Sequence, residues 1–375
     1  EQEVRAALER VLFPFKDFLF SGPVDRGVYL AALLSGVLRP GIGLCPAFGL
    51  DAPQHGSGKT LLANCVVAVA SDQEPCLVPA VDFAGEEETR KRLYSLLREG
   101  PPVVIWDNVV ENFNSPSFAA MLTAETYSDR TLGSSVTKTV IPRTTWLLTG
   151  NNLTPAGDIP RRIAVCRIDP CEVDPYSRVF DLNPQTYCRM NRMEMVRDLL
   201  TLVRGYWASG AEPAPGRVPS FEEWDALVRQ PVAWLAELDN RIGDPIMAFR
   251  RATRFDPVRE QDAELFAALY GEYGEHRFTS EPVLGVHRKV YELETGNSTL
   301  KITESEKRLA DAIEAFNLHG RTLKSQNIGN ILRYRKGRIC GGLQLIEVGK
   351  EHNKSVWNVR IVDRVVFECG DRLAE

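Results

Sequence analysis

The chain of 375 residues is 44% hydrophobic and 25% charged, with a formal net charge of −5 at pH 7. This composition is typical of a soluble globular protein with about two to four folding units. It excludes a membrane-spanning protein, because no apolar run is long enough to cross a bilayer, and the first residues lack the pattern of a signal peptide. We therefore expect a cytoplasmic protein. The acidic total does not exclude a nucleic-acid partner, because local basic patches create the electrostatic footprint.

Residues 1–40 are predicted to form a helical lead-in. Apolar residues recur at helical spacing in residues 4–12 and 26–38, and Pro40-Gly41 ends the second run. The segment contains no pattern that indicates chemistry, so its expected role is structural.

A short apolar strand, a glycine-containing turn and an apolar helix follow one another over residues 48–70. Gly56 and Gly58 allow successive backbone N–H groups to converge on phosphate oxygens, at the amino end of a helix whose dipole favours anions. Lys59 would contact the β- and γ-phosphates, and the Thr60 hydroxyl would bind Mg²⁺. The alternative is an ordinary glycine turn before a buried helix. The whole predicted phosphate loop, and with it a site for ATP and Mg²⁺, is Pro53-Gln54-His55-Gly56-Ser57-Gly58-Lys59-Thr60.

This loop departs from the usual phosphate-loop pattern at its first position, which is Pro53 instead of glycine. Proline fixes φ and donates no hydrogen bond, so the start of the loop is expected to be rigid.

A second predicted strand delivers a carboxylate. Four apolar residues, 103–106, lead into Asp107 and Asn108, and a buried parallel strand presents such residues at its carboxyl end, where open α/β sheets bind ligands. Asp107 would hold the Mg²⁺ shell. Many ATPases have a glutamate after this aspartate to polarise water, and here the residue is Asn108. Either hydrolysis is slow, or Glu111 supplies the base.

A third predicted strand, residues 145–152, ends in polar residues, and Asn151 could hydrogen-bond the γ-phosphate or the attacking water. Ten residues later Arg161 and Arg162 precede another apolar strand. A lone arginine pair indicates surface charge, but in this order it is a candidate arginine finger acting on the nucleotide of a neighbouring subunit. The sequence does not distinguish the two arginines.

The order of these elements resembles the AAA+ type helicases of superfamily three. It is more similar to the ATPase part of primase-helicase proteins from phages and other mobile elements. The resemblance implies an α/β fold with a P-loop AAA+ core at residues 41–170 and a ring, expected to be a hexamer, around a DNA strand. It also implies a primase domain or protein as partner. The matching segments are residues 52–60, Val104-Ile105-Trp106-Asp107-Asn108-Val109, Tyr127-Ser128-Asp129-Arg130-Thr131-Leu132-Gly133, Leu148-Thr149-Gly150-Asn151-Asn152 and Asp158-Ile159-Pro160-Arg161-Arg162.

In such rings a β-hairpin before the asparagine strand carries the channel's DNA contact. Here the hairpin would be residues 133–141, with Lys138 as its only cation. Without the resemblance, an exposed turn lysine is an equally good interpretation of Lys138.

Helical patterns continue beyond the core, and we expect a helical lid at residues 171–275. Ser220 with Glu223 three residues later predicts a capped helix start, and Trp224 is expected in the core. The polar, irregular residues 276–298 are interpreted as a linker.

Residues 299–363 read as two helices followed by two alternating strands, the order of a winged helix-turn-helix whose second helix contacts DNA. The segment has 12 basic and 7 acidic residues. It also resembles the carboxyl-terminal winged domain of the same mobile-element proteins. Protein docking is the alternative role, because the fold does not fix the function. The proposed phosphate contacts are Arg333, Arg335, Lys336 and Arg338.

Two functions from different classes fit these patterns. The first is an ATP-driven DNA helicase or translocase that replicates a phage or other mobile element in the cytoplasm of a bacterial host cell. The second is an ATP-switched origin-binding initiator or helicase loader without processive unwinding, which Asn108 favours. A metabolic P-loop kinase is a weaker third candidate, because we find no acceptor-site pattern.

Overall fold

The computed structural model describes residues 1–79, 85–130, 137–169, 181–293, 301–317, 322–352 and 354–362, without the side chains of residues 110, 111, 130, 292 and 293. The chain divides into two compact units, Glu1–Asp256 and Pro257–Glu375. We call them the N-terminal unit and the C-terminal unit. In the described residues no helix is long and apolar enough to cross a membrane.

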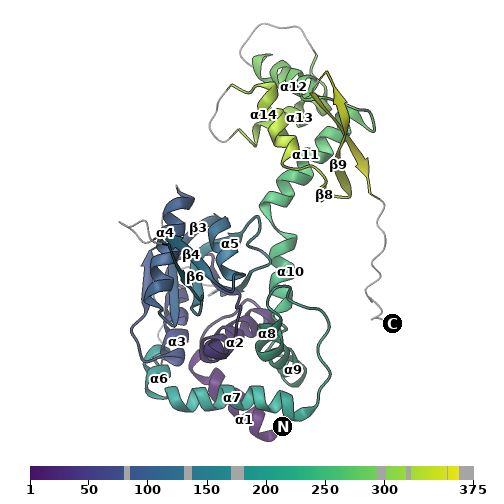
Figure 1. The fold of residues 1–375 in the computed structure, drawn as a ribbon. Coiled ribbons are helices and arrows are strands. Elements are labelled where there is room, and N and C mark those ends of the chain that lie inside the picture. The colour runs from purple at the N-terminus through teal and green to yellow at the C-terminus, as the bar shows by residue number, and fades with distance from the viewer. Residues whose placement is uncertain are drawn as a thin grey trace, which may run out of the picture. The chain divides into compact units, whose positions relative to one another are not determined.

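The N-terminal unit is built around a parallel five-stranded sheet with helices packed against it (Figure 1). Its strand order is β2-β3-β6-β1-β7, so β1 lies between two strands that come much later in the chain. All six residues of β1 are buried, as expected for a parallel strand covered on both faces. The strands are β1 (Ala47–Ala52), β2 (Cys76–Pro79), β3 (Val103–Phe113), β6 (Thr145–Pro155) and β7 (Ile163–Arg167).

Ten α-helices surround this sheet in the described part of the unit, together with a π-helical turn at Asp225–Arg229. They are α1 (Gln2–Leu12), α2 (Pro23–Leu38), α3 (Lys59–Ala70), α4 (Glu86–Glu99), α5 (Pro116–Leu122), α6 (Pro184–Met190), α7 (Arg192–Ser209), α8 (Glu222–Trp224), α9 (Gln230–Leu238) and α10 (Ile246–Arg254).

The predicted lead-in is not separate from the parallel sheet. Helix α1 packs on α7, and α2 packs on α3 and β7, so residues 1–40 share one hydrophobic core with the sheet. Trp224 is fully buried in the same core, as predicted, and its indole N–H donates to the Ser35 hydroxyl over 2.8 Å. The fold therefore joins the lead-in, the sheet and helices α7 to α10 in one unit.

The predicted Ser220 helix cap is wrong. Phe221 is the N-cap of α8 and makes no side-chain capping hydrogen bond. Ser220 has φ +72°, and Glu223 accepts a hydrogen bond from the backbone of Gly43 instead (2.8 Å). Tertiary contacts at this helix start replace the local cap.

A two-stranded antiparallel hairpin, β4 (Tyr127–Arg130) with β5 (Thr137–Val140), precedes β6. It confirms the predicted hairpin at its second strand, but the first strand begins earlier than residue 133, and residues 131–136 lie outside the described residues. The carboxylate of Asp129 pairs with the Arg90 guanidinium of α4. This ion pair fastens the hairpin to the N-terminal unit.

The C-terminal unit combines helices with a three-stranded antiparallel sheet of order β10-β9-β8. Its core contains apolar residues from every one of these elements, among them the fully buried Trp357. The helices are α11 (Pro257–Tyr273), α12 (Ser280–Leu293), α13 (Glu304–Glu314) and α14 (Ser325–Arg333), and the strands are β8 (Ile339–Cys340), β9 (Leu343–Glu351) and β10 (Lys354–Ile361).

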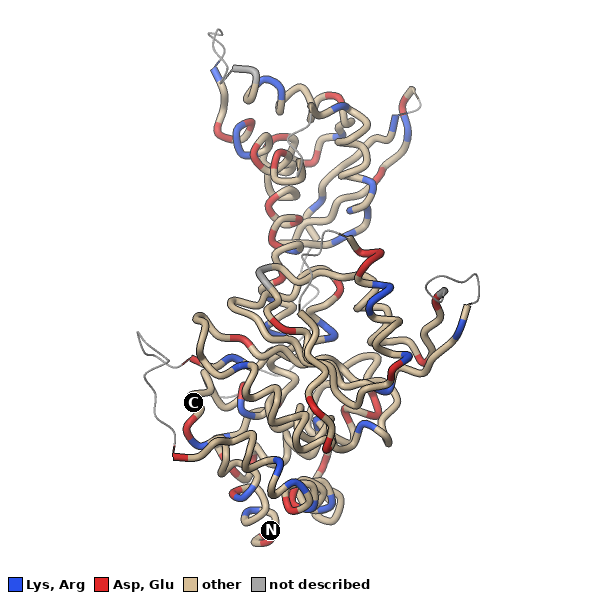
Figure 2. Tube along the Cα trace, turned by 90° about the vertical axis from the view of Figure 1, so that its left-hand side faces the viewer, with Lys and Arg blue, Asp and Glu red and all other residues tan. Residues whose placement is uncertain are grey.

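The predicted boundaries around this unit need correction. The predicted linker 276–298 contains α12, which packs on α13 and α14, and the last part of the predicted lid, 257–275, forms α11 of the same unit. Residues 257–298 and 364–375 add 6 basic and 11 acidic residues to the 12 and 7 of residues 299–363, so the unit has 18 of each. Figure 2 shows both signs along its described chain. The net positive charge of residues 299–363 therefore reflects the predicted domain boundary, and the whole C-terminal unit has no excess of basic residues.

Candidate functional site

The turn between β1 and α3 requires glycine at two places. Gly56 has φ +75° and Gly58 has φ +90°, values that residues with a side chain rarely adopt. A Cβ on Gly58 would also lie 2.8 Å from Cε1 of Phe18. These two glycines let the chain curl tightly into the amino end of the 12-residue helix α3, whose first N–H groups have no partner within the helix.

A cavity of about 530 Å³ opens in front of this turn. It lies at the carboxyl end of β1 and beside the middle residues of β3 and β6, and ligands of open α/β sheets bind beyond the carboxyl ends of strands such as β1. Pro53 and Gln54 of the predicted loop do not contribute to its lining. The lining residues are His55, Gly56, Ser57, Gly58, Lys59, Thr60, Leu61, Asp107, Asn108, Thr149, Gly150 and Asn151.

Lys59 is 9% exposed, and its ammonium group bridges two segments of the site. It donates to the carbonyl of Gln54 (2.9 Å) and to Oδ1 of Asn151 (2.7 Å). Burial lowers the pKa of Lys59, although the charges of Asp51 and Asp107 act in the opposite direction. A buried cation with neutral hydrogen-bond partners favours the arrival of an anion.

Thr60 and Asp107 come from different segments and meet in the cavity, where the threonine hydroxyl donates to Oδ1 of Asp107 over 3.1 Å. Neighbouring ligands of an octahedral ion with bonds of about 2.1 Å are about 3 Å apart. The two oxygens therefore fit a Mg²⁺ site in which water and phosphate oxygens supply the other ligands.

Asn108 occupies a β-bulge. Trp106 pairs with Leu148 and Val109 with Gly150, so two residues of β3 face one residue of β6. Asn108 has φ +60°, a left-handed conformation that asparagine adopts more easily than glutamate. Local backbone geometry thus gives a physical reason for asparagine at this position. The side chain of Glu111, the other candidate base, lies outside the described residues.

Thr149 is a site residue that the sequence patterns did not assign. It is 2% exposed, its hydroxyl donates to Oδ1 of Asp107, and the backbone N–H of Asn108 donates to the same hydroxyl (3.1 Å). One side chain therefore holds both the carboxylate and the bulge beside it. Its position two residues before Asn151 on a strand, on the same face, was the available signal.

Asn151 connects β6 to the turn between β1 and α3, the predicted phosphate loop. Besides accepting from Lys59, its amide nitrogen lies 3.0 Å from the ring nitrogens of His55. The Asn151 side chain is thus hydrogen-bonded directly to the ammonium group of Lys59, and both residues were predicted to belong to the site.

Arg161 and Arg162 differ sharply in their surroundings. The Arg162 side chain is 10% exposed and the Arg161 side chain is 58% exposed, and both pair with the Asp158 carboxylate. Arg162 also donates to the backbone oxygen of Asp158 (2.7 Å). Burial alone would raise the pKa of Asp158, but hydrogen bonds and charge from both arginines lower it below its ordinary value. Arg161 is the arginine available to another molecule.

Both arginines lie far from the cavity of their own chain. Ile163, which follows them, pairs with Ala47 at the start of β1, and Asn151 pairs with Ala52 at its end. Five residue steps along a strand are about 17 Å. This distance exceeds the reach of an arginine side chain, so neither arginine joins the site around Lys59 within one chain.

The predicted DNA contacts are only partly available. Lys138 on β5 is exposed, and so is Arg333 at the end of α14. Lys336 is also exposed but pairs with Glu347 (2.7 Å).

Arg335 and Arg338 both bind the carboxylate of Asp262 on α11, at 2.6 and 2.7 Å. Asp262 is 1% exposed, and Arg335 also stacks over the Phe316 ring, 4.0 Å from its centroid. Arg335 is thus engaged inside the unit, and its role as a phosphate contact stays a prediction. Arg338 remains 47% exposed, but its charge is matched inside the unit. Removing one member of such a buried pair is expected to cost stability.

Comparisons with known proteins identify no family for this chain. Neither the scan against protein-family models nor the search of curated proteins finds a match. Two solved structures, both titled as the A form apo structure of the NrS-1 C-terminal region, resemble it at TM-scores of 0.39 and 0.40. Their identities are 13% and 12%, and each alignment covers 96% of this chain and 75% of that chain.

Proposed function

We propose that the chain is an ATPase that binds ATP and Mg²⁺ at the carboxyl end of β1 in its parallel sheet. The observation that carries this proposal is the meeting of Lys59, the Thr60–Asp107 pair and Asn151 in one cavity at the amino end of α3. The phosphates would accept hydrogen bonds from the backbone of residues 56–60. A bound Mg²⁺ would neutralise charge on the phosphate oxygens.

In this proposal Lys59 exchanges its contacts with Gln54 and Asn151 for the β- and γ-phosphate oxygens. The exchange frees Asn151 to hydrogen-bond the γ-phosphate or the attacking water. Asp107, held by Thr149, supports the metal shell. Asn108 carries no carboxylate, so the base that polarises water lies elsewhere or turnover is slow.

We further propose a homo-oligomeric ring, with six subunits as the expected number, in which Arg161 completes the site of the neighbouring subunit. The support is its exposure combined with its separation from the cavity of its own chain. Arg162 would instead support the turn that presents Arg161, because it is buried against Asp158.

The proposed work of this ring is DNA translocation or unwinding during replication of a phage or other mobile element in a bacterial host, alongside a primase domain or protein. The support is the hairpin β4–β5, which carries the exposed Lys138 where the resemblance predicts a channel contact. Arg333 on α14 would add a phosphate contact from the C-terminal unit, if that unit acts as a winged helix.

The competing function is an ATP-switched initiator or loader. The absence of a carboxylate at Asn108 favours it, because such a protein needs nucleotide binding more than fast hydrolysis.

One experiment separates the two functions. The rate of ATP hydrolysis is measured with and without single-stranded DNA, the particle mass with and without a nonhydrolysable ATP analogue, and strand displacement on forked DNA. A motor is expected to show DNA-stimulated hydrolysis, a ring-sized mass and displacement. Nucleotide-dependent assembly without displacement would assign the chain to the initiator class, and a monomer that does not bind ATP would contradict both.

Thr149→Val is expected to lower the hydrolysis rate about 10- to 100-fold, because the orientation of Asp107 is lost while the side-chain volume is kept. The Kd for ATP measured without Mg²⁺ is expected to change only slightly. Thr149→Ser keeps the hydroxyl and serves as the control. Equal loss of activity in both variants would contradict a role through the hydrogen bond.

A further inference from the structure

Helix α7 has a second apolar face that the core of the N-terminal unit does not use. Its inner face, with Met195, Leu199 and Leu202, is buried, and α7 packs on α1, α3 and α9. The exposed face carries Met193 (71% exposed), Leu200 (39%) and Trp207 (59%). Consecutive members of this set are seven positions apart in the sequence, the spacing that aligns side chains along a neighbouring helix.

Two arginines complete this surface. Arg197 and Arg204 lie between the three apolar residues, so the five side chains follow one another at steps of three and four along one face. The face is about 21 Å long, from 1.5 Å rise per residue. We call Met193, Arg197, Leu200, Arg204 and Trp207 the α7 stripe.

The positive charge of the stripe is not balanced locally. Arg197 lies 3.9 Å from Asp198, whose carboxylate already accepts two hydrogen bonds of 2.7 Å from Arg10. In the part of the chain that the structure describes, Arg204 has no acidic partner within salt-bridge distance. A partner that covers the apolar residues would therefore gain by offering carboxylates.

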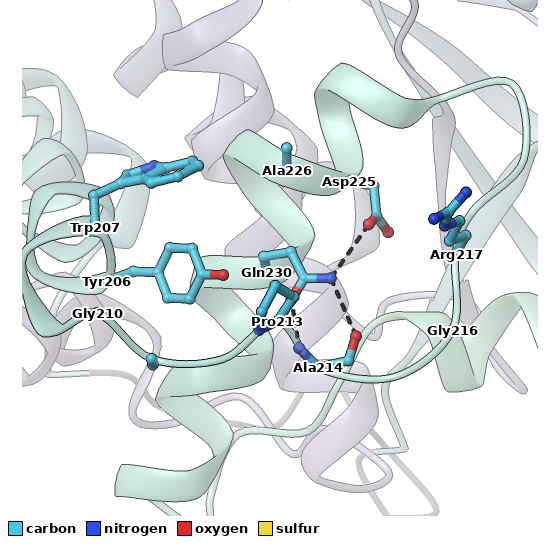
Figure 3. Close-up of a pocket in the computed structure, with 11 residues that line it drawn as sticks. Tyr206, Trp207, Gly210, Pro213, Ala214, Gly216, Arg217, Asp225, Ala226 and Gln230 are labelled. Atoms are coloured by element: carbon cyan, nitrogen blue, oxygen red, sulfur yellow. Dashed lines mark hydrogen bonds between the residues drawn. The ribbon is translucent and has the colours of Figure 1, made fainter.

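The stripe ends beside a cavity of about 680 Å³ (Figure 3). Figure 3 shows the Tyr206 and Trp207 rings on one side and the contact between Gln230 and Ala214 on the other. Gln230 bonds both the N–H (2.8 Å) and the carbonyl (3.3 Å) of Ala214, and buried Arg229 donates to the carbonyl of Pro215 (2.7 Å). These bonds fix the loop, so the cavity exists before any partner arrives.

We propose that the α7 stripe and this cavity form a docking surface for an acidic amphipathic helix of a partner protein. Methionine, tryptophan and arginine are the residue types that protein interfaces favour, and a preformed cavity beside an exposed tryptophan suits an anchoring apolar side chain. Three of the five stripe residues are apolar, whereas a phosphate backbone is bound mainly by cations and hydrogen-bond donors. The surface therefore fits a protein partner better than single-stranded DNA.

The test uses fluorescence anisotropy with the full chain and two labelled helical peptides of about three heptads. Both peptides have leucine at the apolar positions, and the flanking positions are glutamate in one and lysine in the other. The acidic peptide is expected to bind at least about tenfold more tightly, and Leu200→Ser to weaken it about tenfold. Reversing Arg197 and Arg204 to glutamate is expected to invert the preference.

Leu77→Ser is the matched control, because Leu77 is 47% exposed and lies on β2, away from α7. Nucleotide binding is expected to stay unchanged in every variant, so this test does not depend on the proposed ATPase. Equal binding of both peptides would overturn the proposal. If an oligothymidine strand binds more tightly than the acidic peptide and Arg204→Glu abolishes that binding, the surface is a DNA site and the proposal is wrong. If the chain self-associates and Leu200→Ser abolishes the self-association, the partner is a second copy of the chain, which also overturns the proposal.

Discussion

Replacing Lys59 by alanine is expected to reduce ATP hydrolysis at least about 100-fold, with or without DNA. Lys59 is the only lysine or arginine among the described residues that line the cavity between β1, β3 and β6. Its removal would leave the phosphate charge to the backbone amides, Asn151 and the proposed Mg²⁺, and loss of one preorganised group at a developing charge typically costs this much. Hydrolysis rate and the Kd for ATP are the two measurements.

Lys91→Ala is the matched control for this prediction. Lys91 is a partly exposed lysine on α4 that pairs with Glu87 one helical turn earlier, so its loss removes the same charge without touching the cavity. Hydrolysis by this variant is expected to match the wild type. If Lys59→Ala hydrolyses ATP at more than about a tenth of the wild-type rate, the assignment of the cavity as the catalytic site is wrong.

Mixing two inactive variants is expected to restore activity. Lys59→Ala lacks the phosphate-binding lysine and Arg161→Ala lacks the exposed arginine, and each uniform ring should be inactive. In a ring assembled from equal amounts, about one interface in four has an intact Lys59 on one side and an intact Arg161 on the other. Hydrolysis is therefore expected to return to about a quarter of the wild-type rate if the interfaces act independently.

The control for this experiment is a mixture of Lys59→Ala with the Lys59→Ala, Arg161→Ala double variant. No interface in that mixture has an intact Lys59, so no activity should return. A uniform Arg161→Ala ring that keeps wild-type hydrolysis would show that Arg161 is not the finger. Arg162→Ala is expected to act differently, by lowering the melting temperature, because Arg162 is buried.

Asn108 has a local structural reason in addition to the functional one that its position in the sequence suggests. In the sequence its side chain stands where many ATPases have a catalytic glutamate, which favoured a slow enzyme or a switch. In the structure its backbone is left-handed, and its N–H is bound by Thr149. Glutamate there would carry a strain of about 1 kcal/mol. The residue type follows from the bulge, and only measured turnover can say what the bulge does to hydrolysis.

The sequence by itself determined much of the N-terminal unit. Strands β3 and β6 begin at the predicted residues 103 and 145, and they were recognised because buried parallel strands are short apolar runs between turn residues. Asp107 and Asn151 lie near the glycine turn that follows β1, because neighbouring parallel strands run in the same direction and their registers are aligned. These are consequences of local pattern and strand direction, which a sequence contains.

Only the tertiary structure decided the rest, because it depends on partners distant in sequence. Asp262 pairs with Arg335 and Arg338 across more than seventy residues, so no local pattern could show that Arg335 is engaged inside the unit. The different exposure of Arg161 and Arg162, adjacent in the chain, also depends on how the turn around Asp158 packs. The boundary near residue 257 arises because α11 and α12 bury their apolar faces in the core of the C-terminal unit. The polar residues that flank these helices did not indicate with which unit the helices pack.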